Sequence, residues 1–152
     1  EQIRDGMLAV SGELQPYRSQ PSVNGDHPAP SIMVKKIRNQ PDEWLDAFDA
    51  PDMFNSCARR FVTTTPLQSL LVVNSPWSLD RAAALARRAR AAAPESDKVA
   101  LGQAFRYAYA RDPEPDELAW ALNFVDAGKH RDERWIDLCH VLLCSTEFIY
   151  VD

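Results

Sequence analysis

The chain has 152 residues, a length that suits one domain with a sizeable hydrophobic core. Hydrophobic residues make up 45% of it and charged residues 26%, which is ordinary for a globular protein. The 22 acidic and 17 basic side chains give a formal net charge of −5. This balance argues against generic nucleic-acid binding, which needs a basic face. No apolar run approaches the roughly 18 residues of a membrane span.

The first segment has the spacing of an amphipathic helix. Its apolar residues recur at helical intervals: Ile3, Met7, Val10 and Leu14. Gly12 can end this helix, because glycine readily takes the left-handed conformation of a helix C-terminus. Residues 16–30 then hold four prolines among Ser, Asn and Gly, which predicts a long loop. Residues 31–34 can form a short extended piece before the basic run 35–38.

Two helix starts follow. Pro41 fits the first position of a short helix that Pro51 ends. The clearest local signal in the chain is the run Thr65-Pro66-Leu67-Gln68. Its threonine can cap a helix, its proline fits the first helical position, and its glutamine can reach back as in a capping box. The apolar residues 70–73 follow, which predicts a helix that is buried on most sides.

Ser75 can cap an Ala/Arg-rich helix over residues 77–93. Its predicted inward positions are Leu79, Ala83 and Ala86. Its arginines are expected mostly on the solvent side: Arg81, Arg87, Arg88 and Arg90. The last three arginines can touch an acidic partner or a membrane surface, although a solvated helix face is the default interpretation.

Three more helices complete the pattern. Ser96 can cap one that runs to about residue 109, and a turn at 112–115 starts another, which Gly128 ends. The last helix holds Trp135 and runs toward Phe148.

These signals predict an irregular all-α domain of about six helices with a long N-terminal loop. We expect residues 1–152 to form a single helical C-terminal domain. Because the chain starts at Glu1 and not at Met, we also expect it to be a piece of a larger multi-domain protein.

A set of short motifs spans nearly the whole chain. In chain order they are Ile3-Arg4-Asp5, Ser11-Gly12, Phe48-Asp49-Ala50-Pro51-Asp52, Cys57-Ala58-Arg59-Arg60, Thr63 to Gln68, Asn74, Arg111-Asp112-Pro113, Glu117, Trp135 and Ser145-Thr146-Glu147-Phe148-Ile149-Tyr150. With these motifs the chain resembles the planctomycete PSD-one domain, a domain of unknown function (DUF fifteen-fifty-three) found at the C-terminus of large proteins.

The resemblance implies an exported protein, in the periplasm or otherwise outside the cytoplasm. The resemblance also implies a multi-domain protein with a partner domain of unknown function upstream. In many proteins of this type, a haem-binding cytochrome-like region lies further upstream. The family offers no established catalytic residues. This chain departs from it at residues 20–23, where Gln-Pro-Ser-Val replaces a common Gly-Gly-Pro loop. Any ligand site that this loop shapes in the family is therefore in doubt here.

The candidate site lies in the connection before Thr65. Asp49 and Asp52 precede Arg59 and Arg60, and these groups can bind a charged sugar or act as an acid/base pair. The arginine forks can also hold a sulfate or phosphate at the helix start. The structural interpretation, which we favour, is that the carboxylates cap turns and pair with the arginines.

Other side chains have weaker claims. Thr63 and Thr64 can offer hydroxyl groups to a ligand at the same site. The four tryptophans can stack on sugars, although core packing is favoured for most of them and is least certain for Trp120.

His140 and Cys144 stand four residues apart, which suits two ligands of zinc, but Cys57 or His130 would have to complete the set. We expect no metal site. Cys139-His140 lacks the first cysteine of a Cys-x-x-Cys-His motif, so we expect no haem or other cofactor in this chain.

The leading hypothesis is a non-catalytic module that docks against upstream domains of the same polypeptide, with no nucleic-acid partner. It predicts an exposed apolar patch on the opening helix and on Ile32-Met33-Val34. The alternative is part of an extracytoplasmic enzyme that acts on polysaccharide or another polar substrate, with a cleft near Asp49, Asp52, Arg59 and Arg60. A third, weaker hypothesis is a scaffold that positions a haem domain.

Overall fold

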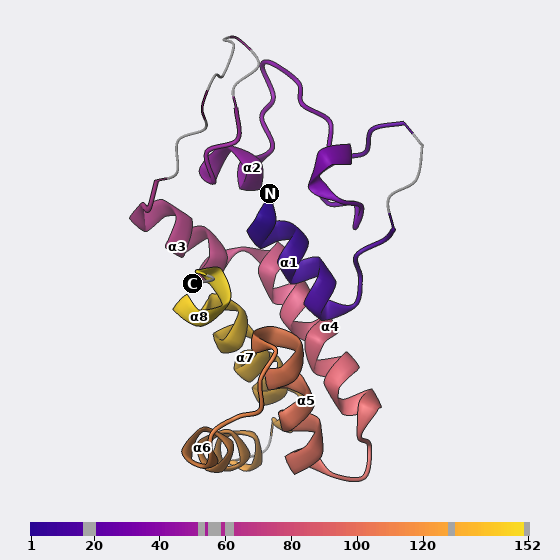
Figure 1. Cartoon of the computed structure of the whole chain (residues 1–152), viewed down its shortest axis with the longest axis vertical. Coiled ribbons are helices and arrows are strands. Elements are labelled where there is room, and N and C mark those ends of the chain that lie inside the picture. The colour runs from indigo at the N-terminus through magenta and orange to yellow at the C-terminus, as the bar shows by residue number, and fades with distance from the viewer. Residues whose placement is uncertain (17–20, 52–53, 55–58, 60–62, 128–129, 151–152) are drawn as a thin grey trace.

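A computed structural model of the chain describes residues 1–16, 21–51, 54, 59, 63–127 and 130–150. Within these ranges the fold is all-α, as the sequence predicts, and six helices are seven residues or longer (Figure 1). The elements are α1 (Gln2–Ser11), the 3₁₀ helix η1 (Ser31–Met33), α2 (Glu43–Ala47), α3 (Pro66–Asn74), α4 (Pro76–Ala92), α5 (Asp97–Tyr109), α6 (Pro115–Asp126), α7 (Arg131–Cys144) and α8 (Thr146–Ile149). None of these helices is both long and apolar enough to cross a membrane.

The core lies around α4, which packs against α7, α5 and α1 (Figure 1). The buried stripe of α4 consists of Ala82, Leu85, Ala86 and Ala89. These positions follow the i, i+3, i+4, i+7 spacing of a helix face. Large side chains of α7, among them the fully buried Trp135 and Leu138, belong to the same apolar cluster. Three of the four positions in the stripe are alanines, and small side chains allow helix axes to approach closely.

The predicted inward face of α4 is only partly right. Ala86 is buried and Ala83 is half-buried, but Leu79 is 39% exposed. The buried stripe passes through position 82 instead of 79, because α4 meets α7 along its alanine-rich face. Arg87 and Arg90 are exposed as expected, whereas Arg81 and Arg88 are half-buried.

Several predicted helix ends are confirmed. Thr65 caps α3 in a reciprocal capping box, and Ser75 and Ser96 accept hydrogen bonds that cap α4 and α5. Gly12 ends α1 with a φ of 80°, a conformation that glycine adopts without a steric penalty. Ser145 interrupts the last predicted helix and divides it into α7 and α8. The predicted stop at residue 128 lies outside the described residues.

Arg4 of α1 organises the long loop. Its side chain is only 2% exposed, and its guanidinium donates to three backbone carbonyls. The acceptors are the oxygens of Gly25 (2.8 Å from Nη2), His27 (2.6 Å from Nη2) and Ala29 (3.0 Å from Nη1). One buried cation thus satisfies carbonyl groups that this loop could not pair within a helix or sheet.

The prediction of an extended piece over residues 31–34 is wrong for most of that segment. The carboxylate of Asp5 accepts from the Ser31 backbone nitrogen at 2.9 Å and from its hydroxyl at 2.7 Å. This carboxylate binds the first residue of a turn of 3₁₀ helix, η1. The apolar residues 32–34 alone do not predict this turn. Only Val34 is extended, and it forms an isolated parallel bridge with Val23.

Candidate functional site

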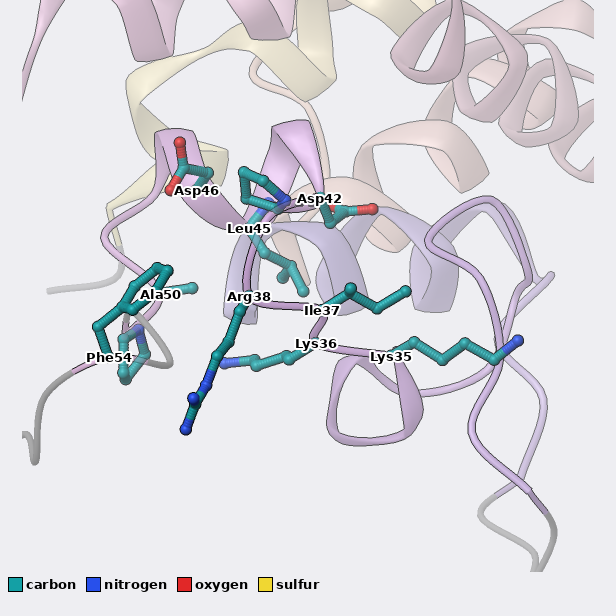
Figure 2. A pocket seen from close by; sticks show the side chains of 11 residues that line it. Lys35, Lys36, Ile37, Arg38, Asp42, Leu45, Asp46, Ala50 and Phe54 are labelled. Carbon is teal, nitrogen blue, oxygen red and sulfur yellow. Dashed lines mark hydrogen bonds between the residues drawn. The ribbon is translucent and has the colours of Figure 1, made fainter.

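A pocket of about 170 Å³ lies between the basic run 35–38 and α2, at the loop end of the molecule (Figure 2). Its described lining residues are Lys35, Lys36, Ile37, Arg38, Pro41, Asp42, Leu45, Asp46, Ala50, Pro51 and Phe54. The lining thus combines an apolar part with three cations and two carboxylates. It borders the connection that carries the predicted site.

The charged groups of this pocket do not converge on one point. Figure 2 shows Lys36 and Arg38 extending toward Phe54, whereas Lys35 extends in the opposite direction. The guanidinium of Arg38 lies 5.9 Å from the centre of the Phe54 ring. Asp42 caps α2 by accepting from the Leu45 nitrogen at 3.0 Å. The geometry therefore suits an anionic or amphipathic group resting beside the cations more than an acid/base pair around a scissile bond.

Asp49 serves as a clamp. It sits at a φ of 57°, and its Oδ2 accepts from both the backbone nitrogen of Thr63 (2.7 Å) and its hydroxyl (2.8 Å). The Thr63 hydroxyl accepts in turn from the Gln68 amide at 3.3 Å, and that amide also donates to the Ala47 carbonyl at 3.0 Å. These bonds tie both ends of the 49–63 connection to the first turn of α3. The observed partner of Asp49 is thus Thr63, and the predicted pairing of Asp49 with an arginine stays a prediction.

The remaining predicted site residues are only partly placed. The Thr64 hydroxyl accepts from Tyr150 at 3.5 Å, which brings α8 beside the start of α3. Arg59 is exposed. Asp52 and Arg60 lie outside the described residues, so the proposed four-residue cleft remains a prediction.

The most unusual surface of the described chain is α3 itself. The prediction that this helix is buried on most sides is wrong, since Leu67 is 65% exposed, Leu70 58% and Val73 49%. The residues that α3 buries most deeply are Gln68 and Val72. A surface helix of a globular protein normally turns its apolar side toward the core and its polar side toward solvent.

The predicted apolar patch therefore exists, but not where it was expected. Met7 and Leu8 of α1 are fully buried, and Val34 is 5% exposed, so only Ile32, at 81%, is widely open in the predicted place. The signal for this exposed patch in the sequence is the continuous run of apolar residues in α3. The prediction of a buried helix assumed that other residues of this chain cover these side chains.

The two candidate zinc ligands instead surround a backbone carbonyl. His140 Nε2 lies 3.2 Å from the Val72 oxygen and 3.4 Å from the Ser78 hydroxyl, and Cys144 Sγ lies 3.8 Å from the same oxygen. Burial raises the pKa of the Cys144 thiol to about 11, which keeps it protonated at neutral pH. These side chains satisfy an open carbonyl at the C-terminal end of α3. Cys57 lies outside the described residues, and those described contain no group of three or more potential metal ligands.

No curated protein and no solved structure matches the chain. A family model described as "PSD1: Protein of unknown function (DUF1553)" matches residues 1–125. The match begins before α1 and ends within α6, so it includes the Arg4 network, the pocket and α3. Because the match covers far more than half of the sequence, the chain belongs to this family of proteins of unknown function.

Proposed function

We propose that this chain is a non-catalytic docking module, and that α3 packs against another part of the same polypeptide. The observation that carries the proposal is the inverted exposure of α3. A contiguous row of large apolar side chains on one short helix faces solvent, while a polar glutamine faces inward. Contiguous exposed apolar patches on a protein surface are typical of interaction sites.

The mounting of α3 supports the proposal. Its first turn is tied down through Gln68, and its last turn through the Val72 carbonyl, which accepts from the Ser78 hydroxyl at 2.6 Å. Residue 75, directly after the helix, accepts from the Trp44 indole nitrogen at 3.3 Å. A helix that is fixed at both ends presents its outer face with little conformational entropy left to lose on binding.

The choice of partner follows from the position of α3. The N-terminus lies at the same end of the molecule as α2 and α3 (Figure 1), and Glu1 pairs with Lys36 of the pocket wall at 3.4 Å. Residues that precede Glu1 in a longer polypeptide would therefore enter beside α2, which packs against α3. The cationic side of the pocket offers the same neighbour a place for acidic groups. The proposal includes the setting that the resemblance implies, an exported, planctomycete-type, cytochrome-associated protein outside the cytoplasm.

The proposal is tested by photo-crosslinking in the full-length polypeptide. Leu70 is replaced by p-benzoylphenylalanine in one sample and Val99 in another. Val99 is a matched control, because it is 52% exposed on α5, away from α3. We expect position 70 to crosslink to residues outside 1–152 of its own chain and position 99 to give no such product. Mixing isotopically heavy and light protein separates crosslinks within one chain from those between copies.

The result that would defeat the proposal is equally specific. Equal crosslinking from both positions would show that α3 is no more covered than an ordinary surface helix. Crosslinks that always join a heavy and a light copy would replace docking within the chain with self-association.

A further inference from the structure

A second cleft, of about 350 Å³, lies where α5, α6, α7 and α8 meet, away from the pocket of Figure 2. Its described lining residues are Phe105, Tyr109, Glu117, Trp120, Leu142 and Glu147. The set contains three aromatic rings, one leucine and two carboxylates. No lysine or arginine is among the described lining residues, but the guanidinium of Arg111 lies 5.3 Å from the centre of the Tyr109 ring and 6.0 Å from that of the Phe105 ring. These two rings thus already face a cation of the chain itself, and Trp120 is the ring left to face a ligand.

Trp120 is the most exposed of the four tryptophans. It is 51% exposed, whereas Trp44 and Trp135 are buried and Trp77 is half-buried. Its ring stacks on Phe124, with the ring centres 5.4 Å apart and an interplanar angle of 19°. The stacking partner limits how the indole can turn. An indole that is fixed in place and open to solvent offers the best aromatic surface for a cation.

The rest of the aromatic lining is also held in place. Phe105 and Tyr109 contact each other edge to face, with their ring centres 5.6 Å apart. The Tyr109 hydroxyl donates to Ser145 Oγ at 2.9 Å, so its hydrogen is already used. A neutral polar ligand such as a sugar needs several donors and acceptors, and the tyrosine hydroxyl can only accept from it.

The two carboxylates carry more charge than their partner neutralises. Arg111 donates to both oxygens of Glu117, at 2.8 and 2.9 Å, and to both oxygens of Glu147, at 2.6 and 2.8 Å. The guanidinium holds the pKa of Glu117 down to about 2 and also lowers that of Glu147. Both carboxylates are therefore ionised at neutral pH, and one guanidinium between them leaves a net charge of −1.

We propose that this cleft binds an organic cation, an alkylammonium or guanidinium group whose carbon atoms rest on Leu142 and Phe105. The positive charge is attracted by the face of Trp120 and by the surplus charge of the two glutamates. The source of the group is either a free small molecule or a basic side chain of a protein. The proposal does not depend on docking through α3, because the two surfaces share no residue.

The test follows the indole N–H signals of the chain by NMR, with the Trp120 signal identified from its loss in Trp120→Phe. The protein is titrated with choline and with 3,3-dimethyl-1-butanol, which has nearly the same shape but no charge. Blocked Gly-Arg-Gly and Gly-Gln-Gly peptides form a second pair. We expect the two cations to shift the Trp120 signal with dissociation constants on the order of 1 mM, and the neutral partners to leave it unchanged.

Variants separate the contributions. Trp120→Ala is expected to weaken cation binding at least about tenfold, whereas Asn123→Ala, an exposed change on the same helix, leaves it unaltered. Because Trp120→Ala removes the NMR probe, binding to this pair is measured by calorimetry. Glu147→Gln removes the surplus charge and is expected to weaken binding about threefold, while Glu133→Gln, outside the cleft, has no effect.

Each outcome decides between the alternatives. Binding of choline alone identifies a small-molecule site, and tighter binding of the arginine peptide identifies a site for a basic protein segment; both support a cation site. Equal binding of charged and neutral probes, or unchanged binding in Trp120→Ala, overturns the proposal. The absence of any shift up to about 50 mM of either cation also overturns it.

Discussion

Arg4 and Leu85 are both buried, yet opposite chemistry surrounds them. Leu85, which is 0% exposed, belongs to an apolar cluster drawn from helices α1 to α7. Arg4 lies under a loop whose backbone carbonyls point at its guanidinium. The helical half of the molecule is therefore held mainly by the hydrophobic effect, and the loop half by charge-assisted hydrogen bonds to main chain.

This contrast predicts that the two halves unfold in different ways. Apolar packing is shared among many side chains, so loss of one of them weakens the whole cooperative unit. The loop has few apolar contacts of its own, and its order depends on single polar side chains such as Arg4 and Asp49. Segments of this kind open locally at a lower free energy than the core.

The largest expected effect is that of Leu85→Ala. Removing this fully buried side chain should lower the free energy of unfolding by about 2–5 kcal/mol, because a cavity remains between α4 and its neighbours. Denaturant unfolding measures the change. Leu79→Ala on the same helix is the matched control, and since Leu79 is 39% exposed it should cost far less. Equal losses in the two variants would show that the packing of α4 is not as described.

Arg4→Met should have the next largest effect, and the effect should be local. The variant leaves three carbonyl groups, one buried and two half-buried, without their donor, which costs about 3 kcal/mol for the closed loop. Hydrogen exchange should show faster exchange at His27, Met33 and Lys35, whose amides are hydrogen-bonded within the loop. Protection in α4 and α7 should change much less.

The control for this variant is Arg106→Met, an exposed arginine that pairs with Asp112. It should leave exchange in the loop unaltered. If Arg4→Met instead speeds exchange throughout α4 and α7, the two halves form one cooperative unit and the contrast between them is lost.

The smallest expected effect concerns the ion pairs of Arg111 with Glu117 and Glu147 in the helical half, which we call the Arg111 clamp. Arg111 lowers the folded pKa of Glu117 to about 2, against an ordinary value of 4.5. The clamp therefore contributes stability that is fully present above about pH 4.5 and is lost as the pH falls toward 2. The contribution is small, because all three side chains are about one-third or more exposed.

NMR titration of the Glu117 side-chain carbonyl carbon measures the midpoint directly. In Arg111→Lys, which cannot form the two-pronged contact, the midpoint should move up toward its ordinary value. Arg106→Lys should leave Glu117 unaltered. A midpoint near the ordinary value in the original chain would mean that the clamp is open in solution.

The sequence predicted best what is decided locally. Thr65, Ser75 and Ser96 cap helices because a side-chain oxygen and a few neighbouring amides suffice, and Gly12 ends a helix through its own backbone freedom. Long amphipathic segments such as residues 97–109 were equally easy to predict as helices. These features need no knowledge of distant residues.

What depends on distant residues was missed. Nothing near Arg4 in the sequence distinguishes a buried hub from a surface arginine, since its three carbonyl partners lie more than twenty positions away. The turn at Ser31 depends on Asp5 in the same way. In α3, the apolar run was recognised, but its exposure depends on what lies outside it.

At the candidate site, the sequence analysis assigned Asp49 and Thr63 to one region but did not predict the hydrogen bonds between them. Their contact spans fourteen positions. The predicted pairing of Asp49 with Arg59 or Arg60 stays a prediction. The acid/base alternative for Asp52 and Arg60 remains a prediction.

The guanidinium of Arg4 recognises the loop through carbonyl oxygens, which every amino acid carries. Substitutions along that loop should therefore be tolerated as long as its path is kept. Gly25 is the exception, because a β-carbon there would collide with the Asp42 carboxylate. We therefore expect relatives to vary more along this loop than at the arginine that binds it. In an alignment of many members, we expect the side chains of this loop to vary and the arginine at position 4 to be retained.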